Sequence, residues 1–181
     1  ETLLHEKIHT LQKRPGTAPF FERLYAAWGW RPVDPAAVPE MVRRHHRTNP
    51  DTPKWFSIGH PRAAHERWLP CVRLREDAEH LTDVDYFLVR RVRDRELTWR
   101  RMRGGKEGGG DPPGEASDDD LHDIAGWFDA YYGGRPHCYQ PEECSAVILA
   151  EWMVSDWASD GRARIQSKAD GVLLENVQAL R

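Results

Sequence analysis

Long hydrophobic runs are missing from this sequence of 181 residues, and no stretch approaches the roughly 20 apolar residues that a membrane-spanning helix needs. No signal-peptide pattern is visible either. The sequence also has little excess of either charge, with 26 Lys and Arg against 29 Asp and Glu and a net charge of -3. We therefore expect no general electrostatic attraction to nucleic acid or to a membrane surface.

Cysteine is scarce as well. The sequence has only Cys71, Cys138 and Cys144, an odd number without a CxxC pair. This favours free thiols and hence a reducing, intracellular compartment. The sequence begins at Glu1 rather than Met, so we expect an N-terminal part to precede it, and that part could have carried a targeting signal.

Aromatic residues compensate for a modest hydrophobic share of 39%, because eight Trp, five Tyr and five Phe can bury large areas. The length predicts one domain over residues 1–181. Apolar residues at helical spacing and helix-terminating residues predict helices over residues 3–14, 19–28, 39–47, 121–132, 141–158 and 168–180.

β-branched and aromatic residues dominate a central region, where two or three antiparallel strands are predicted over residues 71–75, 84–92 and 96–102. Residues 48–70 are rich in Pro and turn-forming residues, so we predict an ordered aromatic loop there. Residues 103–120 form a Gly-, Pro- and Asp-rich segment with little to bury, which predicts a flexible surface loop.

The segment HEKIH lies in the first predicted helix and carries the most specific chemistry. Two histidines at i and i+4 share one helix face and can reach a single ion, and the Glu between them can lie beside a bound water. Zinc held by two neutral His and a carboxylate keeps an open position for that water. We predict His5 and His9 as zinc ligands and Glu6 as general base. The alternative is a helix with two solvated His and one Glu.

HEKIHTLQ, with FFERLYAAWGW after it and PEECSA further on, resembles the zincin superfamily of HExxH metallopeptidases, in particular the gluzincin type. The resemblance implies a zincin-like α+β fold, in which the HExxH helix packs on a second ligand-bearing helix beside a small antiparallel sheet. It implies Glu143 as third zinc ligand and a peptide or protein as substrate. Glu142 stands where these families usually have Asn, and the separation between HEKIH and Glu143 is longer than in thermolysin.

Further residues are candidates around the same site. Glu151 and His137 are alternative metal ligands or supporting residues, and Tyr139 is a candidate hydrogen-bond donor to a developing oxyanion. His137, Cys138 and Cys144 form a less regular alternative set for a structural zinc. The histidine pair and Glu143 remain the favoured ligands.

The favoured function is therefore peptide hydrolysis by a zinc-activated water. The alternative is a catalytically inactive zincin-like structural or assembly protein, with a purely structural zinc or no metal. An open coordination position would favour the enzyme, and a buried Glu6 or a fourth protein ligand would favour the scaffold. A third interpretation is an interaction module that uses the basic run from Arg43 to Arg47, although such a run is usually a solvated face.

Overall fold

The computed structural model of the protein describes residues 2–47, 54–60, 63–75, 77–80, 83–93, 96–101, 124–133, 135, 138–158 and 167–178. The helices are α1 (Thr2–Gln12), α2 (Ala18–Ala27), η1 (Pro35–Ala37, a 3-10 helix), α3 (Glu40–His45), α4 (Ile124–Tyr132), α5 (Pro141–Ala158) and α6 (Lys168–Gln178). The strands are β1 (Trp30–Val33), β2 (Trp55–His60), β3 (Ala63–Leu74), β4 (Val84–Arg93) and β5 (Glu96–Arg101). The predicted α+β class is confirmed.

The strands form one antiparallel sheet in the order β1-β2-β3-β4-β5, in which each strand pairs with the next along the chain. The prediction of a loop over residues 48–70 is wrong, because β2 and most of β3 lie there. Alternate side chains of these strands are apolar, and Phe56, Ile58 and Trp68 are buried in the main core. The register of β2 with β3 ends at Ile58 and Trp68. Pro70 therefore lies on a stretch of β3 that pairs with β4 alone, where a missing N–H is tolerated.

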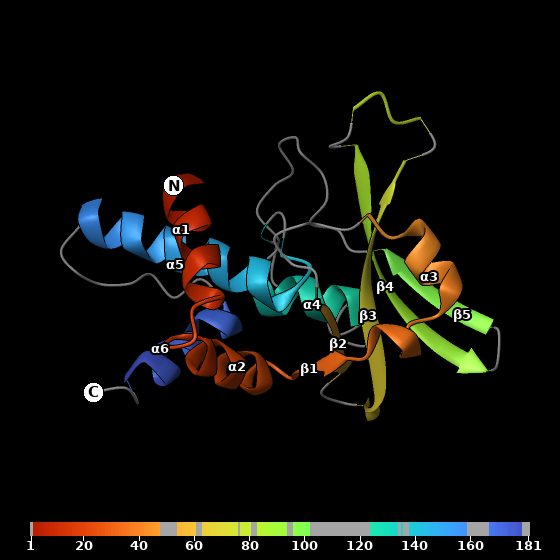
Figure 1. Cartoon of the computed structure of the whole chain (residues 1–181), viewed down its shortest axis with the longest axis horizontal. Coiled ribbons are helices and arrows are strands. Elements are labelled where there is room, and N and C mark those ends of the chain that lie inside the picture. The colour runs from red at the N-terminus through yellow and green to blue at the C-terminus, as the bar shows by residue number, and fades with distance from the viewer. Residues whose placement is uncertain are drawn as a thin grey trace.

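Apolar side chains bury both faces of the sheet. The larger core joins one face to α1, α2, α4, α5 and α6, and the smaller core joins the other face to α3, with Val42 and Cys71 at its centre. Figure 1 shows this division, with most helices gathered beside one side of the sheet and α3 on the other. All three cysteines are free and buried.

Helix α1 makes its main helix contact with α5 and lies across it in Figure 1. The helix predicted at residues 141–158 has those bounds in the structure, and α1 ends two residues before the predicted end. Strand β1 was not predicted. The expected loop at residues 103–120 lies outside the described residues.

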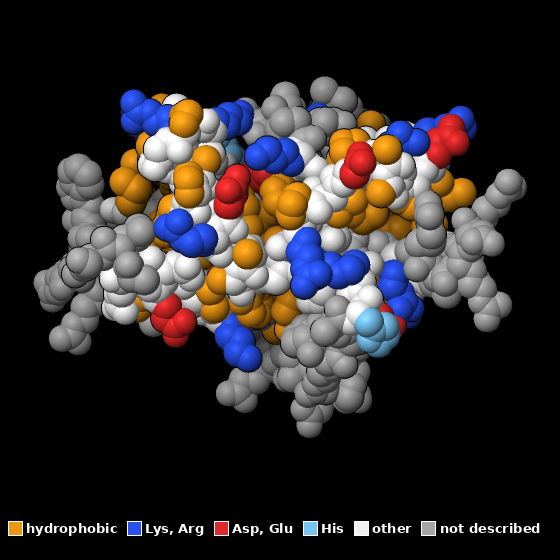
Figure 2. All heavy atoms as spheres, turned by 60° about the horizontal axis from the view of Figure 1, so that its bottom comes forward, with side chains coloured by type: hydrophobic (Ala, Val, Ile, Leu, Met, Phe, Trp, Pro, Cys, Tyr) orange, Lys and Arg blue, Asp and Glu red, His pale blue; other side chains and the backbone are white. Residues whose placement is uncertain are grey.

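On the face shown in Figure 2, Lys and Arg side chains gather near the centre beside hydrophobic ones, with a His side chain close by.

Within the described part of the chain, no helix combines the length and apolar character that crossing a membrane requires.

Candidate metal centre

Two neighbouring turns of α1 carry the histidines of the HEKIH segment. Leu4, Ile8 and Leu11 form the apolar stripe of this helix and pack in the main core. His9 adjoins that stripe and is only 4% exposed, whereas the His5 side chain is 22% exposed. Packing of the stripe thus fixes the helix so that one histidine lies inside the protein and the other reaches its surface.

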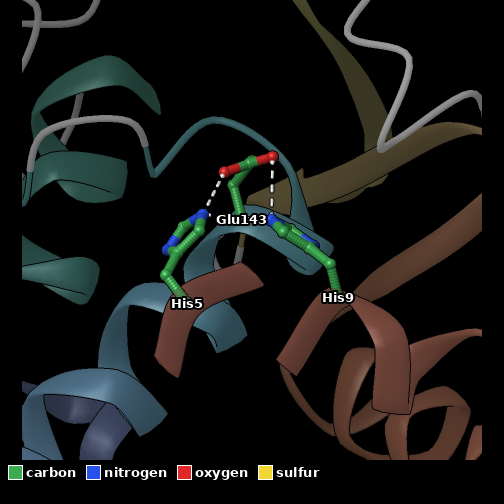
Figure 3. Close-up of side chains that lie close together, drawn as sticks. All are labelled: His5, His9 and Glu143. Atoms are coloured by element: carbon green, nitrogen blue, oxygen red, sulfur yellow. Dashed lines mark hydrogen bonds and ion pairs between the residues drawn. The ribbon is translucent and has the colours of Figure 1, made fainter. Parts of the chain in front are cut away.

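The carboxylate of Glu143 lies opposite both histidines, near the N-terminus of α5, and both rings point toward it in Figure 3. His5 Nε2 is 3.3 Å from Glu143 Oε2, and His9 Nε2 is 3.5 Å from Glu143 Oε1. The two Nε2 atoms are 3.0 Å apart. The structure therefore brings together the three residues predicted as metal ligands.

These separations fit the donor spacing of a zinc site. Zinc bonds of about 2.0–2.1 Å at tetrahedral angles place neighbouring ligand atoms about 3.3 Å apart. The three observed separations, 3.0, 3.3 and 3.5 Å, lie around that value. Two imidazoles and one carboxylate are also a usual donor set for zinc with an open position. The residues present thus fit the ion in both spacing and chemistry.

Gln12 determines which nitrogen of His9 faces the site. Its amide group donates to the Glu142 carbonyl at 2.8 Å and to Ser145 Oγ at 2.9 Å. Because a carbonyl can only accept, the amide orientation is fixed and Gln12 Oε1 must accept from His9 Nδ1, 2.8 Å away. In neutral His9 the proton therefore lies on Nδ1, and the Nε2 lone pair faces Glu143 and His5.

A buried hydroxyl pair supports the Gln12 amide. Ser145 is fully buried, donates to the Glu142 carbonyl at 3.1 Å and lies 3.3 Å from the Tyr25 hydroxyl. Burial raises the pKa of Tyr25, so that this hydroxyl stays protonated. The network ties α1, α2 and α5 together behind the histidines. No sequence pattern assigned this network a role, although Gln12 follows His9 at i+3 on the same helix face.

The electrostatics of the cluster favour a cation. Burial opposes protonation of His9, but hydrogen bonds to Glu143 and Gln12, with the charges of Glu143 and Glu6, outweigh it and raise the pKa of His9 above its usual value. The same negative groups that hold a proton on His9 would stabilise a metal cation in its place.

Glu142 is a second buried carboxyl group beside Glu143. It is 7% exposed, and its Oε2 atom has no hydrogen-bond partner among the described residues. Burial raises the pKa of Glu142 to about 7, although the positive charge of Lys54 acts to lower it. A large fraction of Glu142 is therefore neutral near pH 7, which reduces its repulsion of the Glu143 carboxylate.

The predicted general base, Glu6, lies on the same helix as the two histidines. Glu6 follows His5 directly and is exposed, and its charge contributes to the raised pKa of His9. The His5 side chain is partly exposed as well, so the described residues do not enclose the cluster fully.

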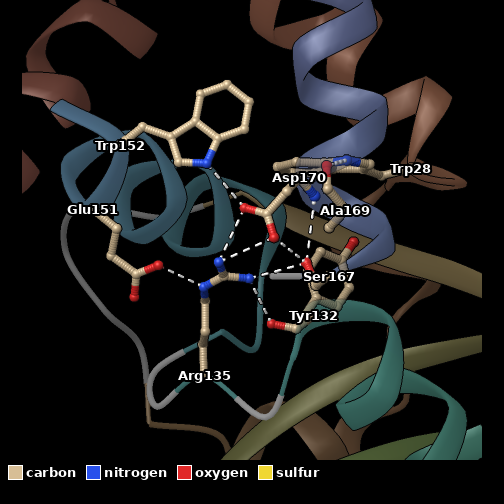
Figure 4. A network of polar contacts seen from close by, with 8 residues as sticks. All are labelled: Trp28, Tyr132, Arg135, Glu151, Trp152, Ser167, Ala169 and Asp170. Atoms are coloured by element: carbon tan, nitrogen blue, oxygen red, sulfur yellow. Dashed lines mark hydrogen bonds and ion pairs between the residues drawn. The ribbon is translucent and has the colours of Figure 1, made fainter. Parts of the chain in front are cut away.

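Glu151, an alternative ligand in the sequence analysis, lies in a different network (Figure 4). Its Oε2 atom accepts from Arg135 Nε at 2.7 Å, and Arg135 also binds both carboxylate oxygens of fully buried Asp170 at 3.0 and 3.1 Å. Ser167 and the Tyr132 carbonyl complete the partners of the guanidinium group. Because these contacts join α4, α5 and α6, Glu151 has a structural partner and is not grouped with the histidines.

Two of the remaining candidates, Tyr139 and Cys144, are buried in the main core. Tyr139 is 8% exposed, and its ring packs against Tyr86 with centroids 5.2 Å apart. Burial raises the pKa of the Cys144 thiol well above its usual value, which disfavours the thiolate that a metal would need. His137 lies outside the described residues, so the alternative sets that include it keep their status as hypotheses.

Comparison of the chain with models of protein families found no match, and comparisons with curated proteins and with solved structures found none either.

Proposed function

We propose that this chain is a zinc-dependent metallopeptidase of the zincin type, in which His5, His9 and Glu143 hold the ion. The observation that carries the proposal is the convergence of the two Nε2 atoms and the Glu143 carboxylate at 3.0–3.5 Å. The residues come from helices far apart in the chain, and local helical geometry alone would not bring Glu143 to the histidines. Peptide as the substrate class rests on the resemblance of HEKIHTLQ and PEECSA to zincins.

The protein groups have distinct roles in the proposed reaction. Bound zinc would polarise the scissile carbonyl and lower the pKa of a water molecule at its open position. Glu6 would accept a proton as the water oxygen bonds to the carbonyl carbon. As the C–N bond breaks, Glu6 would transfer that proton to the leaving amine. Gln12 would keep the His9 Nε2 lone pair directed at the ion throughout.

The alternative function is an inactive structural or assembly protein, with a structural zinc or no metal. With a structural zinc, this alternative predicts a closed site. It needs a fourth protein ligand or a Glu6 withdrawn from solvent. Glu6 is exposed and His5 is partly exposed, and both observations favour the enzyme over the scaffold.

Metal content and hydrolysis measured together test the proposal. We would determine zinc by elemental mass spectrometry in the parent, His9→Ala, Glu143→Gln and Glu6→Gln, and assay each on a library of quenched fluorescent peptides. We expect one zinc per chain in the parent and in Glu6→Gln, loss of zinc in the two ligand variants, and loss of hydrolysis in all three. Glu22→Gln, at an exposed position on α2, serves as the matched control and should behave as the parent.

The outcomes separate the two functions. Zinc in the parent without hydrolysis of any peptide would favour the scaffold. Absence of zinc after reconstitution with a zinc salt would overturn both the metal site and the enzyme. Hydrolysis that persists in Glu6→Gln would remove Glu6 from the role of general base.

A further inference from the structure

A groove beside η1 lies on the sheet face that carries the smaller core. Its volume is about 410 Å³, within the range typical of small-molecule sites. The groove lies between η1 and the strands of the sheet, and its apolar lining is Val33, Ala37, Pro39, Leu69, Val89 and Leu97. Its polar lining is Ser57, His65, Glu66, Arg67 and Arg90, of which Glu66 and Arg90 form an ion pair. None of these residues belongs to the metal centre.

The guanidinium group of Arg67, which lines this groove, is held by hydrogen bonds to Ser57 and Gly29. Arg67 Nε donates to Ser57 Oγ at 3.2 Å, and Nη2 donates to the Gly29 carbonyl at 3.0 Å and to the Ser57 carbonyl. Gly59 is the register partner of Arg67 on the neighbouring strand. A Cβ atom at Gly59 would lie 2.8 Å from Arg67 Nη1, so a larger residue there would require the end of the Arg67 side chain to shift.

The charge of Arg67 has no counter-charge within the described part of the chain. Its hydrogen-bond partners are all neutral, and none of the carboxylates described there forms an ion pair with it. The adjacent Glu66 instead pairs with Arg90. Burial and the nearby charge of Arg31 lower the pKa of Arg67, because both disfavour its cationic form. A partly buried cation without a counter-charge among the described residues has a desolvation cost that a bound anion would reduce.

We propose that this groove binds an amphipathic organic monoanion of the carboxylate class, with its charged group at Arg67 and its hydrocarbon part along the apolar wall. Arg67 favours a negative charge and the apolar wall favours a hydrocarbon part, so a ligand that matches the groove carries both. The apolar wall alone would accept a neutral hydrocarbon, and the guanidinium group alone would accept any small anion. The proposal does not depend on the metal centre or on the proposed peptidase activity.

Isothermal titration calorimetry with three probes tests this combination. We expect the full chain to bind octanoate, and to bind 1-octanol at least about tenfold more weakly, because a hydrogen bond to a charged group is worth about a factor of ten or more. Acetate should show no measurable binding, because it lacks the hydrocarbon part that contacts the apolar wall. Arg67→Gln should weaken octanoate about tenfold and leave 1-octanol unchanged. No octanoate binding at millimolar concentration, or equal affinities for octanoate and 1-octanol, would overturn the proposal.

A pair of neighbouring alanines offers a control that leaves Arg67 and its contacts intact. Ala37 and Ala36 are both exposed in η1, but only Ala37 lines the groove. Ala37→Glu should weaken octanoate at least about tenfold by charge repulsion, and Ala37→Lys should strengthen it. Ala36→Glu should change the affinity less than about twofold, since its charge lies outside the lining. Equal effects of the two glutamate variants would show that octanoate binds elsewhere and would refute the assignment.

Discussion

Gln12 accepts a hydrogen bond from His9 Nδ1 at 2.8 Å, and this contact leaves Nε2 as the nitrogen of the buried histidine that faces Glu143 and His5. The Gln12 amide is itself fixed by the Glu142 carbonyl and Ser145 Oγ, both on the helix that carries Glu143. The orientation of one proposed ligand thus depends on the position of the helix that supplies another. Ligand geometry and helix packing are coupled at this site.

Gln12→Leu should therefore weaken zinc binding without removing a ligand. Loss of a partner that orients a metal-bound histidine typically lowers metal affinity by about 10- to 100-fold. Competition with a chromophoric chelator would measure the change. Gln178→Leu, at an exposed position of α6, is the matched control and should keep the parent affinity. Parent affinity in Gln12→Leu would show that the hydrogen bond to His9 has no bearing on the metal.

Local patterns predicted the part of the site that lies within one helix. The i, i+4 spacing of His5 and His9 is a property of any α-helix, and the helix at residues 141–158 followed from its apolar content and its N-terminal Pro and Glu. The resemblance to zincins, rather than any spacing, indicated Glu143. The choice between Glu143 and Glu151 depends on tertiary contacts, because Glu151 pairs with an Arg135 that no pattern connected to it.

The strands were predicted less well for a similar reason. Strand β1 has four residues, and β2 is surrounded by Pro and turn-forming residues, so neither shows a long alternating pattern. Their pairing is established by contacts across the sheet, such as Trp30 opposite Ile58. Such non-local pairings determine which residues become strand, and the composition of residues 48–70 alone indicated a loop.

Arg135→Ala should cause a large loss of stability. The substitution leaves fully buried Asp170 without its bidentate partner, and an uncompensated buried charge costs about 3–5 kcal/mol. Urea unfolding followed by Trp fluorescence would measure the change in free energy of unfolding. Arg44→Ala breaks an ion pair with Glu40 in which both side chains are more than half exposed, and should cost less than about 1 kcal/mol. Similar losses in the two variants would contradict a special role for the Arg135 network.

His46 should make the protein less stable in mildly acidic solution. Its Nδ1 accepts from the Val72 N–H at 3.1 Å, its ring packs against Trp55, and burial lowers its pKa from 6.5 to about 4. As the pH falls from about 6.5 to 4, the unfolded chain binds a proton on this residue and the folded chain does not. The free energy of unfolding therefore decreases over that window. We expect about 1–2 kcal/mol, since partial exposure reduces the full effect of about 1.4 kcal/mol per pKa unit.

The variant His46→Gln isolates this contribution, because Gln can still accept from the Val72 N–H but does not titrate. Urea titrations at pH 7 and pH 4.5 measure how much free energy of unfolding each protein loses between these two pH values. That loss should be about 1–2 kcal/mol smaller in His46→Gln than in the parent. His45→Gln, at the exposed neighbouring position, should retain the dependence of the parent. If all three proteins lose the same stability over this interval, His46 is not the group responsible.

Zinc should also stabilise the fold, because its proposed ligands lie on two different helices. His5 and His9 belong to α1 and Glu143 to α5, so unfolding separates them and releases the ion. At a free zinc concentration about 100 times the dissociation constant, linkage predicts about 2.7 kcal/mol of added stability. Differential scanning calorimetry should show a higher Tm with zinc than with EDTA in the parent and in Glu6→Gln. The Tm of Glu143→Gln should respond little to zinc at the same concentration, and a response equal to that of the parent would place the ion at another site.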